Sequence, residues 1–205
     1  MAGSVVFGTF WARAFGQTPA GAVVVGKRIY LRRPRIGDFS EWVGLREQSR
    51  MFLTPWEPSW PNDALTRDAF RRRIKRGQQE WREESGYSFF LVRQTDDALL
   101  GGVTLGAIKR GVSDSGVLGY WLGAPYVRQG LMTEAVHCAL DFAFDHLGLH
   151  RVEAACVPDN AASCGLLRKC GFREEGRARD YLRINGVWTD HLLFAILASD
   201  HRPRG

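Results

Sequence analysis

The feature that most constrains the fold is the segment 119–135, in which a strand-like run, a glycine-containing loop and a helix start follow one another. The apolar run ends near Gly123, the loop holds Gly130, and a helix is predicted from about Thr133. In this order the free N–H groups of the first helical turn face the loop, and glycine lets the backbone approach a ligand closely. Arg128 adds a cation beside them. The segment therefore predicts an anion-binding turn, and the alternative is an ordinary strand-to-helix connection.

Composition places this turn in an ordinary globular chain of 205 residues, with 45% hydrophobic and 24% charged residues. No run approaches the roughly 18 apolar residues of a membrane-spanning helix. The net charge of +6 favours anionic partners such as phosphates, nucleic acid or a ribosomal surface. The four cysteines lack metal-ligand spacing, so we expect reduced, buried thiols in a cytoplasmic protein without a metal site.

Hydrophobic periodicity predicts one α+β domain with a mainly antiparallel sheet. A capping-box pattern, Asp38 to Glu41, predicts the start of the first helix, and Asn185–Gly186 predicts a hairpin. The Gly-, Ala- and Pro-containing segment 17–26 is expected to separate an extension over residues 1–24, which lacks signal-peptide features, from a domain over 25–198 and a tail over 199–205. Strands are expected at residues 28–32, 87–93, 99–110, 117–123, 151–157, 179–184 and 187–197, and further helices at about 65–81, 133–147 and 161–170.

Residues 127–132, Val-Arg-Gln-Gly-Leu-Met, resemble the acetyl-CoA motif Q/R-x-x-G-x-G/A of the GCN5-related N-acetyltransferase (GNAT) family. They depart from it at Val127 and Met132. The form Gly-Leu-Met-x-Glu-Ala resembles the RimJ/RimL branch, which acetylates the N-termini of ribosomal proteins. Further matches follow in order at residues 52–58, 160–163, 171–172 and 181–191.

The resemblance implies the GNAT fold, a single mixed, mainly antiparallel twisted sheet with splayed central parallel strands and flanking helices. It implies acetyl-CoA as co-substrate, whose pantetheine arm pairs with a sheet edge as an added strand. Asn160 is expected to contact the pantetheine or to cap the following helix. Backbone groups expected at the pantetheine are those of Tyr120, Trp121 and Leu122, and those expected at the pyrophosphate belong to Arg128, Gln129, Gly130, Leu131, Met132 and Thr133.

Catalytic assignments also follow from the resemblance. Many GNAT enzymes carry a tyrosine acid where this chain has Leu167, which has no proton to donate. Ser163, one helical turn earlier, is expected to hydrogen-bond the departing thiolate, with a structural serine as the alternative. Glu57, Glu41 and Asp190 are candidate general bases. No spacing singles out one of them, and water is the alternative proton carrier.

The implied reaction is direct acetyl transfer to an amine, first of all the α-amino group of a ribosomal protein that begins with alanine or serine. Trp56 and Trp60 are expected to wall the acceptor cleft, and Glu57 to meet the ammonium group. The enzyme is expected to be a monomer or homodimer without membrane or specific nucleic-acid partners. Alternatives are a small-amine acceptor such as an antibiotic or polyamine, an idle acyl-CoA-binding module, and a nucleic-acid binder that uses the basic run 71–76.

Overall fold

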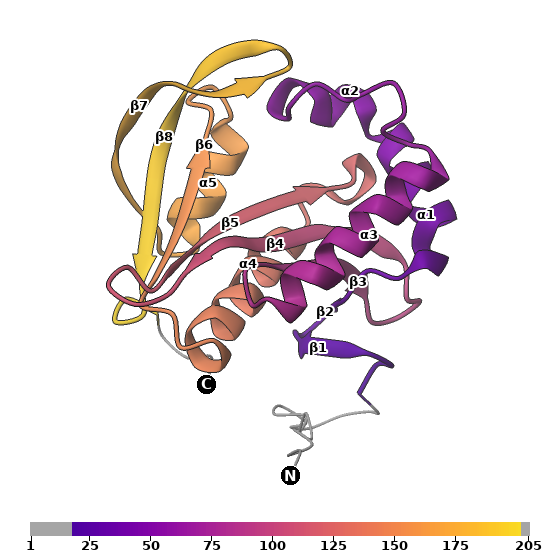
Figure 1. The fold of residues 1–205 in the computed structure, drawn as a ribbon, viewed down its shortest axis with the longest axis horizontal. Coiled ribbons are helices and arrows are strands. Elements are labelled where there is room, and N and C mark those ends of the chain that lie inside the picture. Colours follow the sequence, from indigo (N-terminus) through magenta and orange to yellow (C-terminus); the bar gives the residue numbers. More distant parts are fainter. Residues whose placement is uncertain (1–17, 202–205) are drawn as a thin grey trace.

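Eight strands form one twisted sheet in the computed structural model, which describes residues 18–201 (Figure 1). They lie in the order β1-β2-β3-β4-β5-β6-β8-β7, and every neighbouring pair is antiparallel except β5 and β6. The mainly antiparallel mixed sheet is therefore confirmed. The strands are β1 (Ala22–Val25), β2 (Ile29–Arg32), β3 (Tyr87–Arg93), β4 (Leu99–Lys109), β5 (Ser115–Leu122), β6 (Arg151–Cys156), β7 (Arg173–Ile184) and β8 (Val187–Leu197).

Helices cover both faces of the sheet: α1 (Phe39–Gln48), α2 (Arg50–Leu53), α3 (Arg67–Arg82), α4 (Leu131–Asp141) and α5 (Ala161–Lys169). Successive residues of a strand point to opposite faces, so Phe89 packs in the core of α4 and α5, whereas Phe90 packs in the core of α1 and α3. None of the helices within residues 18–201 is long and apolar enough to cross a membrane.

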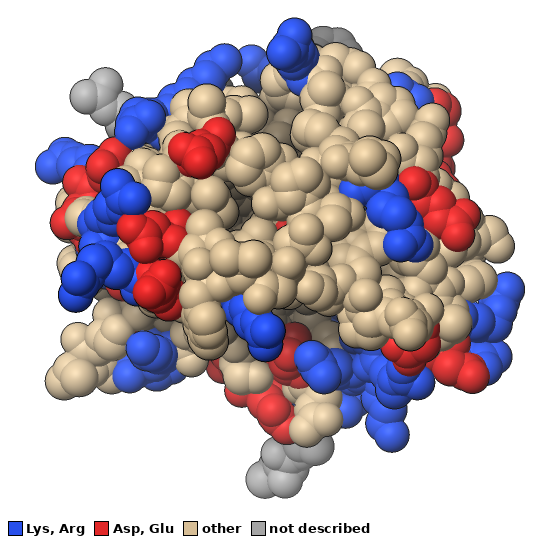
Figure 2. All heavy atoms as spheres, turned by 90° about the horizontal axis from the view of Figure 1, so that it is seen from above, with Lys and Arg blue, Asp and Glu red and all other residues tan. Residues whose placement is uncertain are grey.

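The two central parallel strands diverge after a short paired stretch. β5 and β6 are in register from Ser115 opposite Arg151 to Val117 opposite Glu153, and no further. Beyond this point β5 runs on to Leu122 beside β4 alone, while β6 continues to Cys156 beside β8. The splay predicted for the central strands is thus present. Figure 2 views this end of the molecule, where a broad uncharged surface has a recess and most charges lie toward the rim.

Most elements lie where the hydrophobic pattern predicts them. The Asn185–Gly186 hairpin is confirmed: both residues have positive φ, 44° and 85°, as a type I′ turn requires. β7 begins at Arg173, six residues before the predicted strand. Residues 1–17 of the expected extension and 202–205 of the expected tail lie outside the described part of the chain.

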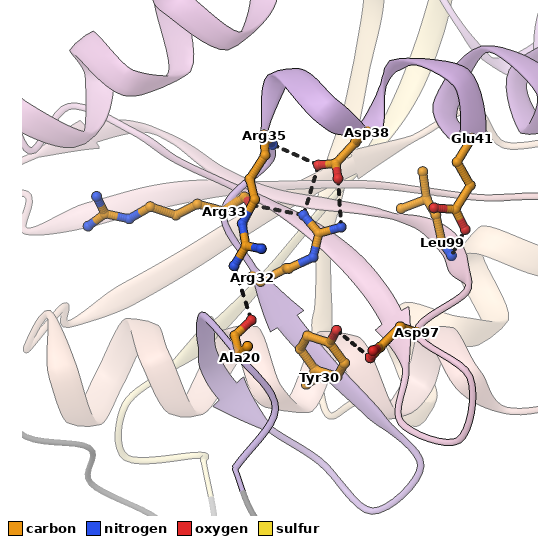
Figure 3. Close-up of polar contacts among 9 residues, drawn as sticks. All are labelled: Ala20, Tyr30, Arg32, Arg33, Arg35, Asp38, Glu41, Asp97 and Leu99. Carbon is orange, nitrogen blue, oxygen red and sulfur yellow. Dashed lines mark hydrogen bonds and ion pairs between the residues drawn. The ribbon is translucent and has the colours of Figure 1, made fainter.

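Two local predictions are wrong. Residues 22–25 do not separate the domain from an extension, because they form β1 and pair with β2. Asp38 and Glu41 do not form a capping box (Figure 3). Asp38 accepts hydrogen bonds from the Arg32 guanidinium, both at 2.8 Å, and Glu41 accepts one from the Leu99 backbone N–H at 2.5 Å. Asp38 also accepts from the Arg35 N–H at 2.7 Å, ahead of α1, so neither carboxylate caps the N-terminus of α1.

Candidate functional site

The loop before α4 presents backbone rather than side chains. Arg128 and Gly130 both have positive φ, 60° and 74°, a conformation that costs Arg128 steric energy and costs glycine little. The first hydrogen bond of α4 runs from the Glu134 N–H to the Gly130 carbonyl at 3.2 Å, so the preceding N–H groups have no partner inside the helix. The side chains of Leu131 and Met132 are buried in the core. The departure from the motif at Met132 therefore leaves the N–H groups of the turn unobstructed.

Arg28 is a cation of this loop that the sequence interpretation missed. Its Nη1 donates to the Gln129 carbonyl at 3.0 Å, and its Nε pairs with the Glu134 carboxylate at 3.0 Å. Its Nη2 lies 3.5 Å from the position that a Cβ would occupy on Gly130. Arg28 and Glu134 are 106 residues apart, and no local pattern links them. The turn thus carries cations from two distant segments.

The free edge of β5 leads from this turn into the splay. Tyr120 and Trp121 point to opposite faces of the sheet: Tyr120 packs against the α4–α5 core and Trp121 against the α1–α3 core. Within the described part of the chain, no strand pairs with the side of Leu118–Leu122 that faces β6. An extended ligand with amide groups can therefore bond to this edge as an added strand.

The N-terminus of α5 faces the end of β5 across the splay. Asn160 is the N-cap of α5, and its Oδ1 accepts from the Ser163 N–H at 3.1 Å. The Ser163 hydroxyl lies 2.7 Å from the Tyr120 hydroxyl. Burial raises the pKa of Tyr120 above its usual value, so this phenol stays protonated at neutral pH. Leu167 is fully buried and offers no proton.

Two thiols lie behind this hydroxyl pair. The Sγ atoms of Cys156, at the end of β6, and Cys164, on α5, are 2.7 Å apart, and all four cysteines are buried and free. Burial, with the neighbouring thiol, raises the pKa of Cys156. Cys156 is therefore a thiol rather than a nucleophilic thiolate near pH 7.

Residues 28–173 match the family described as the acetyltransferase (GNAT) domain. The chain belongs to the GNAT acetyltransferase family. The probable N-acetyltransferase YjcK of Bacillus subtilis is 39% identical over 175 residues, which cover 85% of this chain and 97% of that protein. The ribosomal protein uS5-alanine N-acetyltransferase of Escherichia coli is 31% identical over 156 residues, or 76% of this chain and 80% of that protein. Mycobacterium smegmatis RimJ, solved with CoA-disulfide, superimposes with a TM-score of 0.80 at 32% identity and covers 84% of this chain and 83% of its own.

Arg46 organises the contacts between the loop after α2 and the end of β5. Its guanidinium forms a two-point ion pair with Glu57, at 2.8 and 2.6 Å, and lies over the rings of Trp60 and Trp121, 4.2 and 4.9 Å from their centroids. The Trp60 Nε1–H also donates to Glu57 at 2.8 Å. The Glu57 carbonyl accepts from the Asn185 N–H at 2.9 Å, so the loop after α2 touches the hairpin tip. The two segments that were expected to flank the acceptor are thus joined at this point.

These contacts bear on each candidate base. Glu57 is bound to a cation and an indole, which leaves it poorly placed to meet an ammonium group. Glu41 is bound to the Leu99 backbone on β4. Asp190 accepts from the Asp180 N–H and from Arg177, and these donors hold its pKa below the usual range. None of the three is a free carboxylate, and Trp56 lies half-buried in the turn after α2.

Glu57→Gln is expected to lower the free energy of unfolding by about 2–3 kcal/mol, because it leaves the Arg46 charge without its partner. The Arg46 and Glu57 side chains are only 13% and 22% exposed. Urea unfolding measures the difference. The control is Asp68→Asn, which removes the exposed pair with Arg71 and should change stability by less than about 1 kcal/mol. Equal losses in the two variants would contradict a structural role for the buried pair.

Proposed function

We propose that this protein transfers the acetyl group of acetyl-CoA directly to the N-terminal α-amino group of a ribosomal protein that begins with alanine or serine. The observation that carries the proposal is the free edge of β5, which joins an anion-binding turn at Gly130 to the hydroxyl of Ser163. The relatives named for uS5-alanine acetylation and for RimJ support the choice of acceptor. The reaction belongs in the cytoplasm, where acetyl-CoA and ribosomes meet.

Acetyl-CoA supplies a thioester: the amine nitrogen bonds to the acetyl carbon, the carbon–sulfur bond breaks, and CoA leaves as the thiolate. The backbone of Tyr120, Trp121 and Leu122 bonds the pantetheine amides, and the N–H groups of residues 128–133 with Arg28 hold the pyrophosphate. Asn160 already uses its Oδ1 as a cap, which leaves its NH₂ group to donate to the pantetheine.

Ser163 holds a proton at the leaving sulfur. Its hydroxyl donates toward the charge that develops there, and Tyr120, neutral because it is buried, donates to the Ser163 oxygen. A serine hydroxyl is a weak acid, so its role is a positioned hydrogen bond rather than full proton transfer.

The amine needs little help to lose its proton. An α-ammonium group has a pKa of about 8, so about a tenth of it is already neutral at pH 7. The three carboxylates considered as bases are all engaged in other bonds. Water therefore carries this proton out of the cleft.

The surface around the cleft suits a peptide better than a polyamine. Exposed apolar side chains line both sides of it, on α2 and on the β7–β8 hairpin: Met51, Phe52, Tyr181, Leu182, Val187 and Trp188. Glu57, the carboxylate on the loop between them, is neutralised by Arg46. The Glu57 carboxylate is therefore not available to a polycationic acceptor, whereas a peptide can cover the apolar surface.

Acceptor choice is tested with acetyl-CoA and three substrate sets: peptides that begin with Ala or Ser, α-blocked peptides that contain Lys, and polyamines. We expect kcat/KM to be at least about 100-fold higher for the free Ala and Ser peptides, since a lysine ammonium has a higher pKa and a longer stem. Faster acetylation of the blocked lysine peptides or of polyamines would overturn the N-terminal assignment. The GNAT chemistry itself would stand.

A further inference from the structure

A cavity of about 270 Å³ lies between α3 and the segment that follows β2. Arg33, Arg73 and Arg82 line it, and no carboxylate does. Gly77 and Ser88 also line the cavity. A Cβ added to Gly77 would lie 3.9 Å from the nearest atom, the Ser88 Cβ. The cavity is therefore a hollow lined by cations, with room beside the helix.

The three arginines of this cavity have no ion pair within residues 18–201. On the β2 side, Arg32 is bound to Asp38, whereas the side chain of Arg33 extends the opposite way (Figure 3). Arg33 lies over the Trp81 ring, 3.7 Å from its centroid. On α3, Arg71 and Arg72 pair with Asp68 and Asp63, whereas Arg73 and Arg82 make no ion pair in this part of the chain. Lys75 and Arg76 of α3 are unpaired there as well but do not line the cavity, so Arg33, Arg73 and Arg82 are the unpaired cations that converge on it.

Arg73 connects this cavity to the acceptor side. It also lines a second cavity of about 350 Å³, which is bordered by Arg46, Glu57 and Trp60. Arg46 in turn lies over Trp121 at the end of β5. The two cavities thus share Arg73, and the second one reaches the Arg46–Glu57 pair, which lies beside Trp121 at the end of β5. Among residues 18–201, Glu57 is the only carboxylate that lines either cavity, and Arg46 neutralises it.

We infer that the two cavities form a docking track for an acidic stretch of the acceptor polypeptide, downstream of its acetylated N-terminus. The inference rests on the proposed function only in treating the docked chain as the acceptor. Arg73 and Arg82 are nine residues apart on α3, or about 14 Å, which an extended peptide spans with about four residues. Glu80 also acts on Arg73 at longer range and reduces the net positive charge of the track.

The aromatic surface of the track favours carboxylates over nucleic acid. Single-stranded nucleic acid binds through bases stacked on open aromatic rings as well as through phosphates. Arg33 covers one face of Trp81, and the rings of Tyr87, Phe89 and Phe142 pack against it from the core side. No stacking surface remains on this indole, so guanidinium groups carry the recognition. Planar guanidinium groups match carboxylates with two parallel hydrogen bonds.

The first test uses peptides that begin with Ala and carry a four-residue Asp/Glu block, moved stepwise along the chain, with Asn/Gln versions as neutral partners. At one block position the acidic peptide should have a KM about three- to tenfold lower than its neutral partner. The double variant R33Q/R82Q should remove that advantage and leave kcat unchanged. The matched control R71Q/R72Q removes two paired arginines of the same helix and should keep the advantage. Equal KM values at every block position, or equal losses in both variants, would overturn the track.

The second test measures binding without acetyl transfer. A fluorescent, α-acetylated form of the best acidic peptide cannot act as acceptor, and its anisotropy reports docking alone. Binding that weakens about three- to tenfold in R33Q/R82Q but not in R71Q/R72Q supports the track, even if no peptide is acetylated and the proposed function fails. Absence of binding overturns the track. The track is also overturned if a single-stranded RNA oligonucleotide binds more tightly than the peptide and R33Q/R82Q removes that binding, because the surface would then be a nucleic-acid site.

Discussion

Gly130→Asp is expected to abolish measurable CoA binding. The substitution places a carboxylate at the turn where the N–H groups of α4 and Arg28 are proposed to hold the pyrophosphate. Two like charges about 4 Å apart repel by about 4 kcal/mol at the effective dielectric of a protein surface. The φ of 74° at this position adds about 1 kcal/mol of strain for a residue with a Cβ. The strain is present with and without CoA and lowers stability, so the repulsion alone weakens binding, by a factor of about 1,000, which takes the affinity below what isothermal titration calorimetry detects.

Gly130→Asn is the matched control for this result. Asparagine has nearly the shape of aspartate, tolerates positive φ, and carries no charge. We expect it to weaken CoA binding by about tenfold at most, because the repulsion is absent. If the two variants lose the same affinity, shape rather than charge governs the turn. If Gly130→Asp binds CoA as the unmodified protein does, the site assignment is wrong.

The strand, loop and helix start that are proposed to hold CoA were predictable as elements because they are local in sequence. Strand, loop and helix start lie within residues 119–135, and each leaves a mark that propensity and glycine placement reveal. Asn160 and Ser163 lie within one helical turn of each other, so spacing alone places them on the same helix end. What the sequence did not reveal is that Tyr120 meets Ser163, since that contact depends on how far β5 and β6 diverge.

The charged contacts of the candidate site were not predictable, because most of them join residues that lie far apart in the sequence. Arg28 and Glu134 are far apart in sequence, and so are Glu41 and its partner Leu99. Asp38 carries the pattern of a helix cap, yet the guanidinium of Arg32 on the neighbouring strand takes its carboxylate. A charge-assisted pair in a largely buried place outweighs a local cap. The same competition turns Glu57 from an expected ammonium partner into the counter-ion of Arg46.

Ser163→Ala is expected to lower kcat about 10- to 1,000-fold, with little change in acetyl-CoA affinity, because one positioned hydrogen bond to the developing thiolate charge is lost. The helix should remain intact, since Asn160 caps α5 through the Ser163 backbone N–H, which alanine retains. Single-turnover acetylation of an Ala peptide measures the chemical step. A variant that reacts at the unmodified rate under these conditions would make Ser163 a structural residue.

Tyr120→Phe tests whether the Tyr120 hydroxyl assists the reaction through Ser163 or whether the residue only packs in the core. It keeps the buried ring and removes the hydroxyl that lies 2.7 Å from Ser163. If Tyr120 acts through Ser163, its removal should lower kcat by less than Ser163→Ala does, and the double variant should be no slower than Ser163→Ala alone. Losses that multiply in the double variant would show that the two hydroxyls act independently. A large loss of kcat in Tyr120→Phe together with a normal rate in Ser163→Ala would show that Tyr120, rather than Ser163, donates the hydrogen bond to the thiolate.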